Sequence, residues 1–352
     1  MTAGVLSRYA EWLPIGEATP RISLGEGATP CVSSRVMAQQ MGLASLHFKL
    51  EGLNPTGSFK DRGMVVAVAK ALEQGSRAIV CASTGNTSAS AAAYAARVGL
   101  RAGVVVPAGG IASGKLLQAQ VHGAAVLSVR GGFDAALRLV RELSERYAVT
   151  LVNSVNPHRI EGQKTAAFEI VDELGDAPDV LAIPVGNAGN ITAYWRGFRE
   201  YRAAHRCSHL PRMVGAQAAG AAPLVLGEPV ADPMTVASAI RIGNPASWQG
   251  AVDARDESEG LIDSVTDDAI LDAQDRLARE EGIFCEPASA ASLAVLEKAV
   301  GAGAIARGAH AVCVLTGTGL KDPAAVSAKV APPVDVEPTA DAVAAALGLP
   351  RA

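Results

Sequence analysis

Strand-like and helix-like segments alternate along this chain of 352 residues, and the alternation limits its fold more than any other feature. Short apolar, β-branched runs predict buried strands at Arg77–Ala82, Ala102–Pro107, Ala124–Val129, Thr150–Val155, Val180–Val185, Arg212–Ala218 and Ala311–Leu315. Helical spacing of apolar residues predicts helices at Ser58–Leu72, Thr87–Val98, Phe133–Tyr147, Glu161–Leu174 and Asp267–Glu281. A strand followed by a helix, repeated in this way, predicts an α/β protein with open, twisted, mostly parallel sheets flanked by helices.

Composition and charge exclude several classes of protein. Hydrophobic residues make up 49% and charged residues 19%, so a compact core is expected and general disorder is not. The net charge is −4 without a long basic run, which argues against a nucleic-acid partner. No apolar window reaches the roughly 18 residues of a membrane span, and residues 1–14 lack a signal-peptide pattern, so we expect a cytoplasmic protein. Five scattered cysteines without CxxC spacing predict free thiols and no metal site.

One lysine lies in a segment suited to chemistry. Asn54–Met64 reads NPTGSFKDRGM, in which Ser58 is a candidate helix N-cap with Asp61 three residues later. Lys60 then lies in the first helical turn, where the positive end of the helix dipole lowers its pKa and favours the neutral amine that attacks aldehydes. An exposed lysine at the start of an ordinary amphipathic helix is the alternative for Lys60 taken alone.

Polar or glycine-rich loops follow several of the predicted strands, where α/β sheets bind ligands. The loops are Ala82–Ser90 (ASTGNTSAS), Pro184–Asn190 (PVGNAGN) and Leu315–Pro323 (LTGTGLKDP). The first two lead into predicted helices, whose free N–H groups bind anions well, although a plain cap or turn also explains such a loop. In Asn153–Thr165, Ser154 and Arg159 are candidates for binding a phosphate, and a surface arginine is the alternative.

These segments together resemble the fold type II, tryptophan-synthase-β-like enzymes that use pyridoxal 5′-phosphate. The lysine segment and the Gly-Asn-Ala-Gly-Asn turn are most similar to those of the threonine synthase family, and the resemblance runs from about Tyr9 to Pro323. It implies two α/β domains with the active site in the cleft between them. Residues 51–148 would form the small domain, and residues 1–50 with 149–352 the large, cofactor-binding domain.

The resemblance also implies roles for individual residues. Lys60 would hold the cofactor as a Schiff base and serve as the general base, while Asn86 would hold the 3′-oxygen and Thr316 would lie beside the pyridine nitrogen. The cofactor phosphate would lie in the turn formed by Gly186, Asn187, Ala188, Gly189 and Asn190. Substrate would contact Ser83, Thr84, Thr87, Ser154, Arg159 and Asn187. Glu286 would be architectural or would orient the ring.

The reaction implied by the resemblance is that of a lyase in threonine biosynthesis. It converts O-phospho-L-homoserine and water to L-threonine and phosphate by γ-elimination and β-addition of water, and the family predicts a homodimer. A threonine or serine dehydratase, or another pyridoxal-phosphate enzyme acting on a phosphorylated or acylated amino acid, remains an alternative. A non-catalytic metabolite-binding α/β protein is the alternative from a different class.

Overall fold

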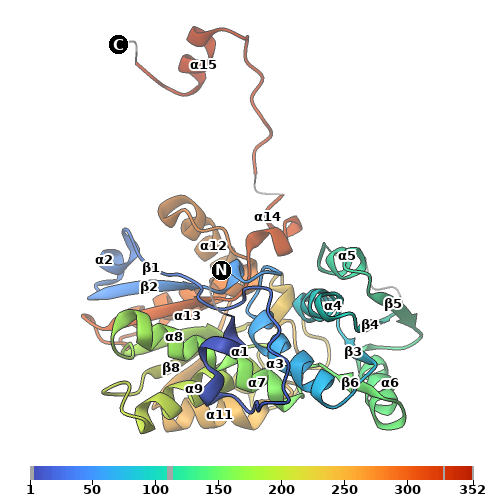
Figure 1. The fold of residues 1–352 in the computed structure, drawn as a ribbon. Helices are drawn as coiled ribbons and strands as arrows, with labels where there is room; N and C mark the ends of the chain where they lie inside the picture. Colours follow the sequence, from blue (N-terminus) through green and yellow to red (C-terminus); the bar gives the residue numbers. More distant parts are fainter. Residues whose placement is uncertain (1–3, 109–113, 328–329, 351–352) are drawn as a thin grey trace. The chain divides into compact units, whose positions relative to one another are not determined.

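The computed structural model describes residues 4–108, 114–327 and 330–350, and it divides the chain into two units, Met1–Asp322 and Pro323–Ala352 (Figure 1). The second unit contains two short helices, α14 (Ala324–Ser327) and α15 (Ala340–Ala346). Thr339 caps α15 by accepting a hydrogen bond from the N–H of Ala342. None of the helices in the described ranges has the length and apolar run that a bilayer crossing needs.

The first unit contains a sheet of six strands in the order β1-β2-β10-β7-β8-β9. These strands are β1 (Cys31–Ser33), β2 (Ser45–Leu50), β7 (Val180–Pro184), β8 (Arg212–Ala218), β9 (Leu261–Val265) and β10 (His310–Leu315). Every neighbouring pair is parallel except β1 and β2. The central strands β7 and β10 are almost fully buried, in agreement with their continuous apolar sequences.

A second, fully parallel sheet has four strands in the order β5-β4-β3-β6. They are β3 (Ala78–Ala82), β4 (Arg101–Pro107), β5 (Ala125–Val129) and β6 (Val149–Leu151). Figure 1 shows them together with α4, α5 and α6 on one side of the unit. The predicted α/β class with mostly parallel sheets is confirmed, whereas the division into a small and a large domain stays a prediction.

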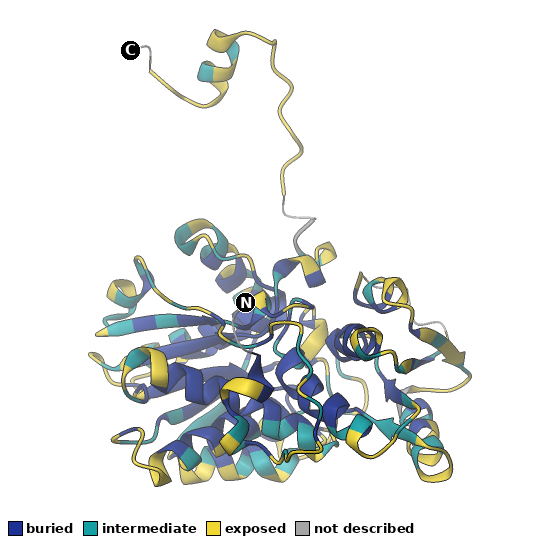
Figure 2. Ribbon diagram, viewed as in Figure 1, coloured by how far each residue is buried: buried dark blue, intermediate teal, exposed yellow. Residues whose placement is uncertain are grey.

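Helices cover the sheets, and the ones nearest the sheets are the most buried (Figure 2). Their bounds are α1 (Val5–Arg8), α2 (Met37–Met41), α3 (Lys60–Glu73), α4 (Asn86–Val98), α5 (Gly114–Val121), α6 (Phe133–Arg146), α7 (Pro157–Gln163), α8 (Thr165–Leu174), α9 (Gly189–Ala203), α10 (Pro223–Leu226), α11 (Trp248–Glu257), α12 (Asp267–Glu281) and α13 (Pro287–Gly301). The alanine-rich α13 packs against β7, β8 and β10, because small side chains allow a helix to lie close to a sheet.

Two predicted elements differ from the structure. The helix predicted over Glu161–Leu174 is two helices, α7 and α8, which meet at Lys164. The strand predicted over Thr150–Val155 ends at Leu151. Beyond it the Asn153 side chain takes the place of backbone pairing: its Oδ1 accepts from the N–H of Ala82 and its Nδ2 donates to the Ala82 carbonyl, both at 2.9 Å.

Helices α3 and α7 cross at two glycines, Gly63 and Gly162. A Cβ on Gly162 would lie 2.0 Å from the carbonyl oxygen of Arg62, and a Cβ on Gly63 would lie 2.6 Å from that of Arg159. Only glycine permits backbones to approach so closely. The crossing therefore brings the start of α3, with Lys60, next to α7, with Arg159.

A buried ion network fixes α3 to the larger sheet. The Arg62 guanidinium contacts both carboxylate oxygens of Glu51, at 2.7 Å each, and both oxygens of Glu169, at 2.8 and 2.6 Å. Lys49 of β2 also binds Glu169, at 3.0 Å, and the Thr29 hydroxyl joins Arg62 to Glu51. The two cations hold the pKa of the Glu169 carboxyl far below its usual range, against the opposing effect of burial.

Candidate active site

Backbone pairing sets Lys60 beside two segments that are distant in sequence. The N–H of Phe59 donates to the Thr316 carbonyl at 3.0 Å, and Ser58 forms an isolated bridge with Gly317. Thr318, the residue after Gly317, forms a second isolated bridge, with Cys285. Lys60, Thr316 and the Cys285–Glu286 segment are therefore held together by main-chain bonds, which do not depend on side-chain rotamers.

The predicted side-chain cap of α3 by Ser58 is wrong. The residue at the N-cap is Phe59, and no side chain caps the helix. The Ser58 hydroxyl is buried and has no hydrogen-bond partner among the described residues. The Asp61 carboxylate accepts instead from the N–H and hydroxyl of Thr56, at 2.7 Å each, and from the hydroxyl of Ser90 in α4, at 2.6 Å. Asp61 thus connects the first turn of α3, which contains Lys60, to α4, which begins at Asn86.

Lys60 has the properties of a nucleophilic amine. Part of its side chain stays accessible, yet its pKa is lowered to about 7 by burial within the surrounding protein and by the nearby Arg159 cation, with Glu286 opposing the shift. Burial is the largest of these causes. Nζ lies 4.2 Å from the centre of the Phe59 ring, and no described residue forms a hydrogen bond or ion pair with it. The amine is free to react.

Asn86 begins α4, directly after the loop of hydroxyl residues. Its Nδ2 donates to Glu286 Oε1 at 2.9 Å, while its Oδ1 is buried without a partner in the described part of the chain. No side chain of the described residues caps α4, so its first N–H groups are available to an anion. Within the loop, Ser83 accepts from the N–H of Gly85, Thr84 is exposed, and Thr87 is buried.

Arg159 is fully buried, which excludes the surface position considered for it from sequence. Nη1 donates to the Val152 carbonyl at 2.9 Å, but Nε and Nη2 have no partner among the described residues. Burial lowers its pKa to about 10, with Cys81 and Asp61 opposing the shift, so the guanidinium stays charged at neutral pH. Ser154 is half-buried on the segment that Asn153 ties to Ala82, and this places it beside the Ser83 loop. A buried guanidinium with free donors is suited to an anionic ligand.

The glycine-rich turn after β7 leads into α9 as predicted. Ala188 adopts a left-handed conformation at the N-cap, and none of the described side chains caps the helix. Both polar amide atoms of Asn190 are buried without partners in the described ranges. Asn187 accepts from the N–H of Ala246 through its side-chain Oδ1 and from the N–H of Ser247 through its backbone carbonyl. A Cβ on Gly186 would lie 3.0 Å from the backbone of the 238–240 segment, so the turn packs closely there.

The turn also lies next to α7, the helix that carries Arg159. A Cβ on Gly189 would contact the Ile160 side chain at 3.4 Å, and Ile160 follows Arg159 in α7. The two predicted anion sites, the turn and Arg159, are therefore both next to or part of α7, which crosses the helix that begins with Lys60 at Gly63.

Sequence reasoning missed three polar side chains in this region. The hydroxyl of Ser289 lies 2.9 Å from that of Thr316 and accepts from the N–H of Gly317 at 2.9 Å, so it fixes the Thr316 hydroxyl. The buried amines of Lys115 and Lys321 flank Glu286. Ser289 lies one helical turn after Glu286, a spacing that could have signalled it. The two lysines become visible only when distant segments meet.

Comparisons with known proteins decide the family. Residues 22–317 match the pyridoxal-phosphate dependent enzyme family. The threonine synthase of Halalkalibacterium halodurans is 60% identical over 91% of this chain and 90% of its own length, and that of Mycobacterium tuberculosis is 56% identical over 96% and 94%. The chain belongs to the threonine synthase branch of this family. The solved structure of maize serine racemase, 21% identical, covers 90% of this chain and 91% of its own with a TM-score of 0.72, and shares the fold.

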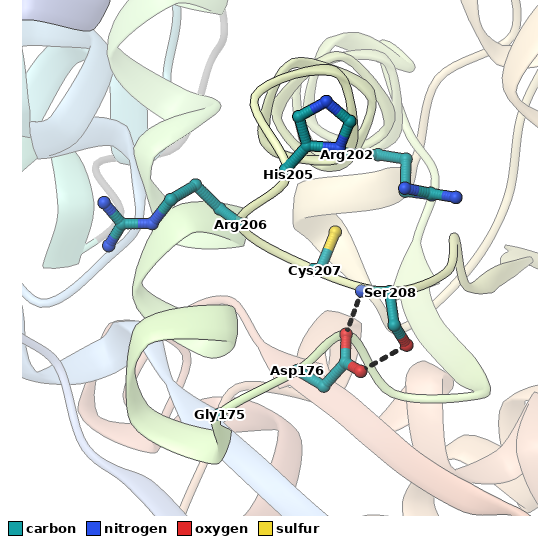
Figure 3. Close-up of a pocket in the computed structure, with 7 residues that line it drawn as sticks. All are labelled: Gly175, Asp176, Arg202, His205, Arg206, Cys207 and Ser208. Atoms are coloured by element: carbon teal, nitrogen blue, oxygen red, sulfur yellow. Dashed lines mark hydrogen bonds between the residues drawn. The ribbon is translucent and has the colours of Figure 1, made fainter.

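The residues of this chain fit pyridoxal phosphate, the cofactor of its family. A reactive amine at Lys60, the uncapped glycine turn before α9, and the buried amides of Asn86 and Asn190 are the groups that an aldehyde, a phosphate and a polar ring require. Among the described residues, Oδ1 of Asn86 and both polar amide atoms of Asn190 have no hydrogen-bond partner. Unpaired buried polar groups each cost about 1–3 kcal/mol, so they indicate a site built to bind a polar ligand. A surface hollow of about 390 Å³ near Asp176 and Arg202 involves none of these residues (Figure 3).

Proposed function

We propose that this threonine synthase family member converts O-phospho-L-homoserine and water to L-threonine and phosphate. The observation that carries the choice of substrate is Arg159, whose buried guanidinium has two unpartnered nitrogens near the lysine amine. A phosphate on the substrate would accept hydrogen bonds from both nitrogens. An unphosphorylated hydroxy amino acid would leave a buried charge without its partner.

Two groups near Lys60 would bind the substrate: the uncapped start of α4 and the unpaired nitrogens of Arg159. The substrate carboxylate would lie at the start of α4, against Ser83, Thr84 and Thr87. The substrate phosphate would lie between Ser154 and Arg159, with Asn187 nearby. Because Asn153 ties the two loops together through Ala82, both ends of the substrate would be bound within one rigid frame. This frame orients the reacting carbon atoms toward the lysine.

Lys60 carries the proton transfers. Its lowered pKa lets a large share of the amine stay neutral near pH 7, so it can take a proton and return it later. Arg159 keeps the pKa low before substrate arrives, and the incoming phosphate would offset that positive charge. Substrate binding would thus strengthen Lys60 as a base at the moment when the proton must be taken.

The chain's other polar residues hold and orient the cofactor, which supplies electron withdrawal when bound. Gly186, Asn187, Ala188, Gly189 and Asn190 would bind its phosphate through backbone N–H groups and the Asn190 amide. Asn86 would donate to the ring oxygen. The Thr316 hydroxyl, fixed by Ser289, would lie against the ring nitrogen and, being neutral, would not protonate it.

The decisive experiment supplies O-phospho-L-homoserine and measures inorganic phosphate and threonine together. Equal release of both supports the proposal, whereas phosphate with 2-oxobutanoate, or 2-oxobutanoate from threonine itself, supports a dehydratase. Borohydride reduction of the cofactor-loaded enzyme should fix the cofactor on the peptide that contains Lys60, and Lys60→Ala should prevent this. The proposal includes a homodimer, whose mass light scattering after gel filtration tests, and a cytoplasmic location, which fractionation of cells tests.

A further inference from the structure

Lys115 of α5 forms a buried ion pair with Glu286, which precedes α13. The Nζ–Oε2 distance is 3.1 Å, and the two side chains are 5% and 1% exposed. Lys115 also lies 3.1 Å from the hydroxyl of Ser238 and 3.6 Å from the carboxylate of Asp322. An amine with three oxygen neighbours, one of them a buried carboxylate, is held in a single position.

The other oxygen of Glu286 fixes the amide of Asn86. A carboxylate only accepts hydrogen bonds, so the Asn86 atom 2.9 Å from Oε1 must be the nitrogen. This leaves one N–H of Asn86, and its buried Oδ1, directed elsewhere. The amide cannot rotate by half a turn, because Oδ1 would then face the carboxylate oxygen and both would repel.

The backbone of the 316–318 segment prevents Glu286 from moving away. The Glu286 N–H donates to the carbonyl of Gly317 at 3.0 Å. A Cβ on Gly317 would lie 2.6 Å from Oε1, so the carboxylate occupies the space that a side chain would need. The chain of contacts from Lys115 through Glu286 to Asn86 is therefore continuous and rigid.

We propose that Lys115 and Glu286 are positioning residues, which hold the Asn86 amide in the one orientation that donates a hydrogen bond to the ring oxygen of the cofactor. The proposal rests on the assignment of Asn86 to the cofactor made above. Lys115 acts here through Glu286 and touches neither substrate nor cofactor. The alternative is that Lys115 only fastens α5 to the larger sheet.

A double-mutant cycle on the cofactor-binding enzyme separates the two roles. The variants are Lys115→Met, Asn86→Ala and their combination, and the readouts are the pyridoxal-phosphate dissociation constant and the pH midpoint of the visible absorbance band. Lys115→Met should weaken cofactor binding about 5- to 10-fold and move the midpoint, because Glu286 loses its buried ion-pair partner and the Asn86 hydrogen bond to the cofactor is weakened. In the Asn86→Ala background the same change should have less than about a twofold effect.

Several outcomes would overturn the proposal. An equal effect of Lys115→Met with and without Asn86 shows that Lys115 acts by another route. An unchanged dissociation constant and midpoint in Lys115→Met also refutes it. If Asn86→Ala itself changes neither readout, the assignment of Asn86 to the cofactor fails first, and the two failures are thereby distinguished.

Two further variants guard against misfolding and general charge effects. Glu286→Gln keeps the size of the side chain but permits both orientations of the Asn86 amide, so it should reproduce the effect of Lys115→Met and not add to it. If Lys115→Met does not fold, the cycle of Glu286→Gln with Asn86→Ala decides by the same criterion. Lys298→Met removes an amine whose ion pair with Asp263 is 49% and 36% exposed, and should change neither readout.

Discussion

Replacing Lys60 by methionine should change how the stability of the cofactor-free protein depends on pH. The lysine pKa is about 7 in the folded chain and 10.5 as the ordinary value, so the unfolded chain binds more protons between these two values. The free energy of unfolding therefore rises with pH across this window, because the folded chain has lost the lysine proton and with it the cost of a buried cation. Methionine has similar size and no charge, so the variant lacks this rise.

The magnitude follows from the two pKa values. Between about pH 6 and about pH 9 the unfolded lysine stays protonated while the folded one loses its proton, which corresponds to about 2.5 kcal/mol of stability. The side chain is partly accessible, and solvent screening reduces the expected value to about 1.5–2.5 kcal/mol. The advantage of Lys60→Met over the natural chain should therefore be larger at the lower pH by this amount.

Urea unfolding followed by tryptophan fluorescence measures the difference, since the chain has three tryptophans. Comparing the natural chain with Lys60→Met at each pH cancels the titration of every other group that the substitution leaves alone. Lys298→Met, which removes an exposed lysine, serves as the control and should show no pH-dependent difference. Parallel pH profiles for the natural chain and Lys60→Met would refute the account of a buried, neutralised amine.

Three other substitutions test separate parts of the structure. Arg159→Lys keeps the charge but loses the planar fork of the guanidinium, so kcat/KM for O-phospho-L-homoserine should fall about 10- to 100-fold in steady-state assays. An unchanged kcat/KM would contradict the binding of the substrate phosphate by Arg159. Gly162→Ala places a methyl group 2.0 Å from a carbonyl oxygen and should cost about 3 kcal/mol or more in urea unfolding, whereas Gly301→Ala, with open space around it, should be neutral or slightly stabilising. Glu169→Gln should cost about 3–5 kcal/mol at neutral pH. Because the folded pKa of Glu169 is depressed, that loss should shrink as the pH falls below the ordinary value of 4.5; a loss that is independent of pH would contradict the ion network.

The sequence predicted the parts of the fold that follow a regular period. Buried strands such as β7 and β10 have continuous apolar runs, and α12 has the bounds expected from its spacing. The strands β2 and β9 were missed, because β2 alternates with His47 and Lys49 and β9 contains Asp263, so neither has such a run. Lys49 is tolerated inside the sheet only because Glu169, far along the chain, pairs with it.

The site divides in the same way. Glycine turns and loop hydroxyls could be located from sequence, since each follows a strand and opens a helix. The contact of Asn86 with Glu286, 200 positions later, and the environment of Arg159 depend on how α4, α7 and α13 meet. The predicted Ser58 cap was wrong for the same reason. The local pattern assigned the Asp61 carboxylate to the start of the helix, but that carboxylate accepts hydrogen bonds from Thr56 and Ser90 instead.

The salt-bridged arginine of α3 has a consequence for the lysine two residues before it. Five directional contacts to Glu51, Glu169 and Thr29 prevent α3 from turning about its axis or sliding along it, because either motion would strand a charge in a water-free interior. The direction in which the Lys60 side chain leaves the helix is thus settled during folding. Loops around the candidate active site can then vary in sequence, and with them the proposed choice of substrate, while the Lys60 amine keeps its place.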